Sequence, residues 1–179
     1  MERRRLYVLD ANVFIQARRR YYAFDICPGF WDSLLAYHDQ GNVLSIDRIE
    51  GELRSFEGGD EIIDWMENAI PPSFFVSTGE PDTIASYSQI IDWVNEQPRI
   101  FQAAKDDFAR GADGWLIAYA HAKDSIVVTH ESARRPNAQN KVLIPNVCHA
   151  FGIGCVNTFE MLRALGVSFI CDDDDPVPF

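Results

Sequence analysis

The first apolar run of the chain is Leu6-Tyr7-Val8-Leu9, and Asp10 follows it directly. No polar residue interrupts this run, which is typical of a strand that is buried on both faces of a parallel sheet. In open parallel sheets, functional groups gather where the strands end. The run therefore predicts a buried strand that places Asp10 at the functional edge of a sheet.

Short apolar runs alternate with segments of helical periodicity along the rest of the chain. Further strands are expected at residues 43–46, 126–128 and 154–156, an edge strand or buried loop at 74–76, and a last strand at 169–170. Helices are expected at residues 11–20, 29–40, 61–69, 82–96, 112–122, 146–151 and 159–165, and one more after Asp47. This alternation predicts an α/β fold whose parallel sheet is covered by helices on both faces.

Three side chains are predicted to cap helix starts. Asn12 and Thr158 are of the residue types that accept a hydrogen bond from the first turn. Asp47 has Glu50 three positions later, which resembles a capping box. Asn12 has a second interpretation, in which its side chain orients Asp10 or a bound water.

The composition is that of a globular protein. The chain has 179 residues, of which 47% are hydrophobic and 24% are charged. No internal repeat and no linker divides it, so we predict one domain over residues 1–171, followed by a solvated acidic tail over residues 172–179. The four acids in this tail are consecutive aspartates, at residues 172–175.

The charge balance limits the classes of function. Lys and Arg total 16 and Asp and Glu total 27, so the formal net charge is −11. Affinity for nucleic acid would therefore require a local basic patch or metal ions. No run of about 18 apolar residues exists, which argues against a membrane span. The four cysteines have no CxxC spacing and no signal-peptide pattern follows the basic start, so a cytoplasmic protein is expected.

Four acidic residues follow or flank the predicted strands. Asp10 ends the first strand, Glu52 lies in the helix after the second, and Glu131 comes two residues after Thr129, where a later strand ends. Asp113 begins an otherwise apolar helix, where the helix dipole favours its ionised form. Each acid alone is also typical of a turn, a cap or a solvated helix position. Together they predict one acidic cluster at the carboxyl edge of the sheet.

Such a cluster repels itself unless a cation neutralises it. Carboxylate oxygens are ligands that suit Mg²⁺ or Mn²⁺. Divalent ions held in this way can activate water and stabilise the charge of a displaced phosphoryl group. The acids therefore point to metal-dependent hydrolysis of a phosphate ester.

Four motifs carry a resemblance to a known family. They are VLDANVFI at residues 8–15, SIDRIEGEL at residues 45–53, ADGWLIAYA at residues 112–120 and VVTHE at residues 127–131. In this order and spacing they resemble the motifs of the PIN-domain ribonucleases. The resemblance implies a three-layer α/β/α fold with a central parallel sheet. It also implies Mg²⁺- or Mn²⁺-dependent cleavage of RNA, often by the toxin of a toxin–antitoxin pair, and frequent homodimers.

The resemblance assigns roles residue by residue. Asp10, Glu52 and Asp113 would hold the metal, and Glu131 would be the fourth catalytic and metal-binding acid. The fourth position is more usually Asp, so Glu131 could reach the metal directly or through water. Glu50 is a rival of Glu52, and the family pattern favours Glu52 because it places the acid before Leu. The segment 57–107 is longer than a minimal family member needs and could reshape the substrate groove.

Several further residues have two interpretations. Thr129 could bind a phosphate or a metal-bound water, or it could be an ordinary residue at a strand end. His130 could be a general base or an exposed side chain. RNA contact or simple solvation is expected of the basic residues Arg18, Arg19, Arg20, Arg134 and Arg135. Asp106 and Asp107 could join the acidic cluster or form a polar helix face.

Two other classes of function compete with the ribonuclease. An aspartyl phosphatase would use Asp10 as its nucleophile, but that chemistry generally needs a second acid two residues later, where this chain has Asn12. A PIN-like scaffold would bind a protein partner and would not need a metal. We therefore favour the ribonuclease, with RNA as its substrate and a protein antitoxin as its partner.

Overall fold

The fold is built around one parallel sheet. The computed structural model describes residues 5–133 and 139–169. Its strands are β1 (Tyr7–Leu9), β2 (Val43–Ile46), β3 (Phe75–Val76), β4 (Ile126–Val128) and β5 (Cys155–Val156). They are parallel and lie in the order β3-β2-β1-β4-β5. This confirms the strands predicted at residues 43–46, 126–128 and 154–156. Residues 74–76, predicted as an edge strand or a buried loop, contain the edge strand β3.

The all-apolar strand β1 takes the centre of the sheet because each of its residues is buried. Tyr7 lies opposite Val43 of β2 on one side and opposite Ile126 of β4 on the other. The ladder continues past the strand end, where the Asp10 N–H donates to the Val128 carbonyl at 3.0 Å. Asp10 therefore occupies the middle of the carboxyl edge, as the sequence predicts.

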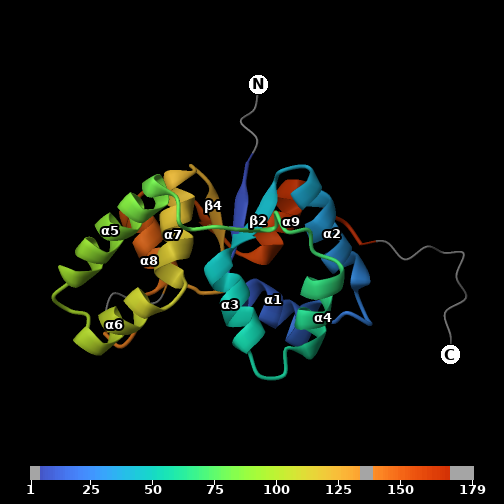
Figure 1. The fold of residues 1–179 in the computed structure, drawn as a ribbon, viewed down its shortest axis with the longest axis horizontal. Helices are drawn as coiled ribbons and strands as arrows, with labels where there is room; N and C mark the ends of the chain where they lie inside the picture. Colours follow the sequence, from blue (N-terminus) through green and yellow to red (C-terminus); the bar gives the residue numbers. More distant parts are fainter. Residues whose placement is uncertain (1–4, 134–138, 170–179) are drawn as a thin grey trace, which may run out of the picture.

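Helices cover both faces of the sheet (Figure 1). They are α1 (Ala11–Gln16), the π-helix η1 (Ala17–Tyr21), α2 (Pro28–Asp39), α3 (Asp47–Ser55), α4 (Asp60–Asn68), α5 (Pro81–Asn95), α6 (Gln102–Arg110), α7 (Asp113–Ala122), α8 (Ile144–Ala150) and α9 (Thr158–Leu165). Figure 1 shows α5 to α8 on one side of the strands and α1 to α4 on the other. The arrangement is a three-layer α/β/α fold with a central parallel sheet, as the sequence predicts.

Helix α7 sets the position of one candidate acid. Its side chains are almost all apolar, and it packs against α5 as well as against β1 and β4. Gly114 permits a close approach at its start, because a Cβ there would lie 3.1 Å from Tyr87 Cε2 and 3.2 Å from Phe108 Cε1. This packing fixes the first turn of α7, and with it Asp113, against its neighbours.

The predicted caps are wrong at three helix starts. Asn12 is the second residue of α1, and Asp10 precedes the helix. Asp47 is already helical, and its carboxylate accepts a hydrogen bond from the Thr78 hydroxyl at 2.8 Å instead of capping α3. In α9 the capping residue is Asn157, one position before Thr158, and Glu160 completes its capping box.

Other differences are few. Helix α6 was not among the predicted helices, and Phe169 is not in a strand. The predicted RNA contacts Arg134 and Arg135, and the acidic tail at residues 172–179, lie outside the described residues. Within the described part of the chain, none of the helices combines the length and the apolar character that a membrane crossing requires.

Candidate active site

Asp10 is the innermost acid of the site. It is 2% exposed, and its Oδ2 accepts hydrogen bonds from Thr129 Oγ1 at 2.7 Å and from Asn12 Nδ2 at 3.3 Å. Burial raises its pKa to about 6, although the hydrogen bond from Thr129 opposes this rise. The charges of Glu131 and Glu52 raise the pKa further. Asn12 therefore orients Asp10, which is the second of its two interpretations.

Thr129 links two acids. Its hydroxyl donates to Asp10 and accepts the N–H of Glu131 at 3.1 Å. The residue is 1% exposed, so water cannot replace either bond without opening the site. Adjacent strands explain the contact, because β1 and β4 end side by side.

Substitution of Thr129 is expected to lower stability. Thr129→Val keeps the shape of the side chain but removes both hydrogen bonds, at a cost of about 1–3 kcal/mol in the free energy of unfolding. It also removes a bond that lowers the pKa of Asp10. Urea unfolding checks this result, with Thr129→Ser, which retains the hydroxyl, as the control. Equal losses in the two variants would contradict a role for the hydroxyl.

Asp113 begins α7 and faces the same charges. Burial raises its pKa to about 7, and the charges of Asp10, Glu131 and Glu52 act in the same direction. The positive charge of Lys141 opposes them. A carboxylate whose pKa is this high carries a charge that its surroundings compensate poorly. The carboxylates of Asp10 and Asp113 would therefore be stabilised by a bound cation.

The structure distinguishes Glu52 from its rival Glu50. Glu52 Oε1 accepts the Ala112 N–H at 3.1 Å, which places its carboxylate beside the start of α7. Glu50 turns to the other side and accepts two hydrogen bonds from Arg54, at 3.0 and 2.9 Å. Only Glu52 of this pair is among the charges that act on Asp10 and Asp113. The geometry agrees with the preference for Glu52.

Glu131 is held on both oxygens. Its side chain is 9% exposed; Oε1 forms an ion pair with Lys141 Nζ, and Oε2 accepts the Ile144 N–H at 2.9 Å. The second bond satisfies a backbone donor at the start of α8. The sequence gives no signal for Lys141, because its partner becomes a neighbour only when the segment after β4 returns to the sheet edge.

The four acids share one region but do not converge on one point. Within residues 5–133 and 139–169, no group of three or more His, Cys, Asp or Glu side chains is arranged to hold a metal ion. Glu52 and Glu131 are drawn to backbone N–H groups and to Lys141. The donor set itself fits a hard divalent cation, because it consists of carboxylates. The raised pKa values of two of them, Asp10 and Asp113, reflect negative charge that is not compensated.

The basic and aromatic residues near this edge are partly engaged. Arg18 forms an ion pair with Glu61 at 2.7 Å, and the Arg19 guanidinium lies 4.5 Å from the centre of the Phe56 ring. Arg20 is exposed. His130 is half-buried, its Nε2 lies 2.9 Å from Thr158 Oγ1, and burial lowers its pKa.

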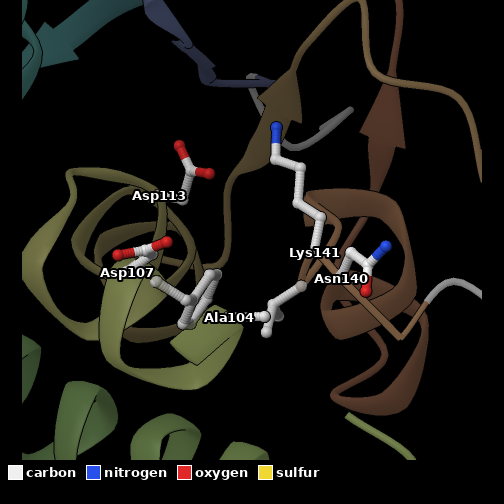
Figure 2. A pocket seen from close by; sticks show the side chains of 7 residues that line it. Ala104, Asp107, Asp113, Asn140 and Lys141 are labelled. Carbon is white, nitrogen blue, oxygen red and sulfur yellow. The ribbon is translucent and has the colours of Figure 1, made fainter. Parts of the chain in front are cut away.

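Asp106 and Asp107 lie on α6 and are exposed. Asp106 accepts a hydrogen bond from Gln102 at 2.8 Å, and Asp107 pairs with Arg110 at 2.5 Å. Asp107 also lines a pocket with Asp113 and Lys141 (Figure 2). These contacts agree better with a polar helix face than with membership of the acidic cluster.

Comparisons with known proteins place the fold. A search of curated proteins gave no significant match. The structure is similar to a chain of the crystal structure of FitAcB from Neisseria gonorrhoeae, with a TM-score of 0.53 and 20% sequence identity, covering 86% of this chain and 99% of that chain. At this identity the likeness concerns the fold. The family described as Domain of unknown function (DUF4411) matches residues 7–169, and the chain belongs to that family.

Proposed function

We propose that the protein is a metal-dependent endoribonuclease that cuts RNA phosphodiester bonds. The observation that carries the proposal is the pair Asp10 and Asp113, two carboxyl groups at the carboxyl edge of the sheet whose pKa values are raised to about 6 and 7. Charges placed in this way favour a cation, and with it an anionic substrate. The fold and the four motifs resembling the PIN-domain ribonucleases support RNA as the substrate.

Each residue of the site has a proposed part. Asp10, Glu52 and Asp113 hold Mg²⁺ or Mn²⁺, and Glu131 contributes as the fourth acid. Asn12 and Thr129 keep the Asp10 carboxylate in one orientation through their hydrogen bonds. A bound divalent ion would supply activated water and would stabilise charge on the phosphate. The exposed Arg20 is available to a phosphate of the RNA backbone.

The biological setting is part of the same proposal. Many PIN-domain ribonucleases act as toxins, so we infer a protein antitoxin that controls this chain. A homodimer remains a prediction of the resemblance. Coexpression of the chain with its genomic neighbour, followed by size-exclusion chromatography of the purified sample, tests both partners.

Metal binding and cleavage test the enzyme. Mn²⁺ binding is measured by calorimetry for the wild type and for Asp10→Asn/Asp113→Asn, and a mixed RNA pool is then incubated with each protein. We expect binding and metal-dependent cleavage by the wild type, and neither by the double variant. Glu50→Gln is the matched control, because it removes a carboxylate from α3 that faces Arg54.

The alternative of a protein-binding scaffold gives a different result. A scaffold need not bind Mn²⁺, and the double variant would keep its partner. No binding by the wild type at millimolar metal would favour that alternative over the ribonuclease. Cleavage that persists in the double variant would contradict the assigned residues.

A further inference from the structure

Lys141 places a positive charge in the acidic region. Its Nζ forms an ion pair with Glu131 Oε1. The partners differ in exposure, because the side chain of Glu131 is 9% exposed and that of Lys141 is 58% exposed. The carboxylate is therefore fixed from within, by the Ile144 N–H, while the lysine reaches it from the solvent side.

The same side chain faces a second acid. Lys141 and Asp113 line a pocket of about 270 Å³, together with Asn140, Val142 and residues of α6. Figure 2 shows the two side chains on opposite sides of this pocket, both extending toward the sheet. Burial is the main cause that raises the pKa of Asp113, and the charge of Lys141 partly offsets it. The ammonium group thus acts on Glu131 by contact and on Asp113 through space.

We propose that the ammonium group of Lys141 is the internal counter-cation of the acidic cluster, and that a divalent ion must displace it from Glu131. This inference rests on the metal site of the proposed function. It accounts for the position of Glu131 in a region where the described acids are not arranged around a single point, whereas Glu52 is held separately by the Ala112 N–H. While Lys141 holds Glu131, the fourth acid is directed to the ammonium group and to the Ile144 N–H.

Lys141 is therefore a positioning residue, and its removal should change the affinity of the protein for Mn²⁺. When only a fraction of the protein is in the state that can bind a ligand, the apparent affinity for that ligand is reduced in proportion to the fraction. Here the competent state is the one in which Glu131 is free of Lys141. Removal of Lys141 releases Glu131 and deletes a positive charge that repels the incoming ion. Lys141→Met is therefore expected to bind Mn²⁺ about tenfold more tightly than the wild type.

The experiment is a calorimetric Mn²⁺ titration of the purified chain at one pH and ionic strength. Lys141→Arg retains the charge and should bind close to the wild type. Lys123→Met is the matched control, because Lys123 is also paired with carboxylates, those of Glu80 and Asp82, but at the opposite end of α7. It removes the same net charge without touching the candidate site.

Thermal unfolding without added metal gives a readout that does not depend on the ion. Lys141→Met should melt a few degrees below Lys141→Arg, because its acids lack their counter-cation. Equal or weaker Mn²⁺ affinity in Lys141→Met, with binding intact in the wild type, would overturn this inference alone. Absence of binding in every variant would overturn the proposed function as well.

Discussion

Asp113→Asn is expected to lower the rate of metal-dependent RNA cleavage strongly and, at the same time, to stabilise the protein in the absence of metal. The loss of activity should reach about a thousandfold, because a metal ion contributes several kcal/mol to the transition state and each 1.4 kcal/mol is about tenfold in rate. The gain in stability follows from the pKa of Asp113, which is raised to about 7. A raised pKa means that the ionised carboxylate destabilises the folded state above that pH. Asparagine has the same shape without that charge.

Two measurements check this pair of effects. Cleavage rates at saturating Mn²⁺ give the first, and the melting temperature in a chelating buffer near pH 8 gives the second. A gain of about 1 kcal/mol corresponds to about 2–4 °C for a chain of this size. A substitution that damages activity only by unfolding the protein would lower both quantities, so opposite signs identify a charge kept for function at the expense of stability.

Asp107→Asn is the control for Asp113→Asn. Asp107 borders the same pocket, but its carboxylate is exposed and paired with Arg110. It should change neither the cleavage rate nor the melting temperature by much, since exposed pairs contribute little. A comparable loss of activity in both variants would show that the pocket responds to net charge, and it would remove the specific role of Asp113.

The sequence predicted the sheet well because each strand carries its own signal. Residues 43–46 form β2 as predicted, and Asp10 lies at the carboxyl edge. Short apolar runs that lack polar alternation are typical of buried strands in a parallel sheet. The edge strand β3 was ambiguous because a two-residue strand has too few residues for a periodic pattern.

Helix starts were harder to predict, for a local reason. Neighbouring residues of similar chemistry compete for each cap, as Asn157 and Thr158 do before α9, and backbone geometry decides between them. Helix α6 was not recognised because its residues, Gln102–Arg110, are mostly polar and their apolar face is narrow. Its buried side chains are Ala104, Lys105 and Phe108.

The candidate site was predictable only in part. Asp10, Asp113 and Glu131 could be named because each follows or begins an element with a clear signal. Glu52 lies inside α3 and could be named because the family pattern places an acid before Leu53. Their partners could not, since the Ala112 N–H, the Ile144 N–H and Lys141 are brought to them by tertiary packing. The distinction between Glu50 and Glu52 needed the direction of each carboxylate, which a spacing of two residues on a helix does not reveal.

The stability of the protein without metal should fall as the pH rises from about 4 to about 7. In the folded chain Asp10 and Asp113 keep their protons up to pKa values of about 6 and 7, whereas an unfolded Asp loses its proton near 3.8. Over that window the folded state binds more protons than the unfolded state. The free energy of unfolding therefore decreases with pH, by up to about 1.4 kcal/mol per pH unit for each group.

The difference in the free energy of unfolding between the wild type and a variant without the two acids separates this effect from the titration of other groups. Asp10→Asn/Asp113→Asn lacks both groups, so its advantage in stability over the wild type should be small at low pH and should grow to several kcal/mol near pH 8. Urea unfolding across this range, in a chelating buffer, measures the two curves. Parallel curves would contradict the raised pKa values of both acids.

Added Mn²⁺ should reverse the trend in the wild type alone. The ion binds ionised carboxylates, so its affinity rises with pH through the same window and its binding near pH 6 releases protons. Calorimetry in two buffers with different ionisation enthalpies counts those protons. A release of one to two protons per ion, lost in the double variant, would show that Asp10 and Asp113, which destabilise the fold, also bind the metal. Binding without proton release would show that the ion binds elsewhere.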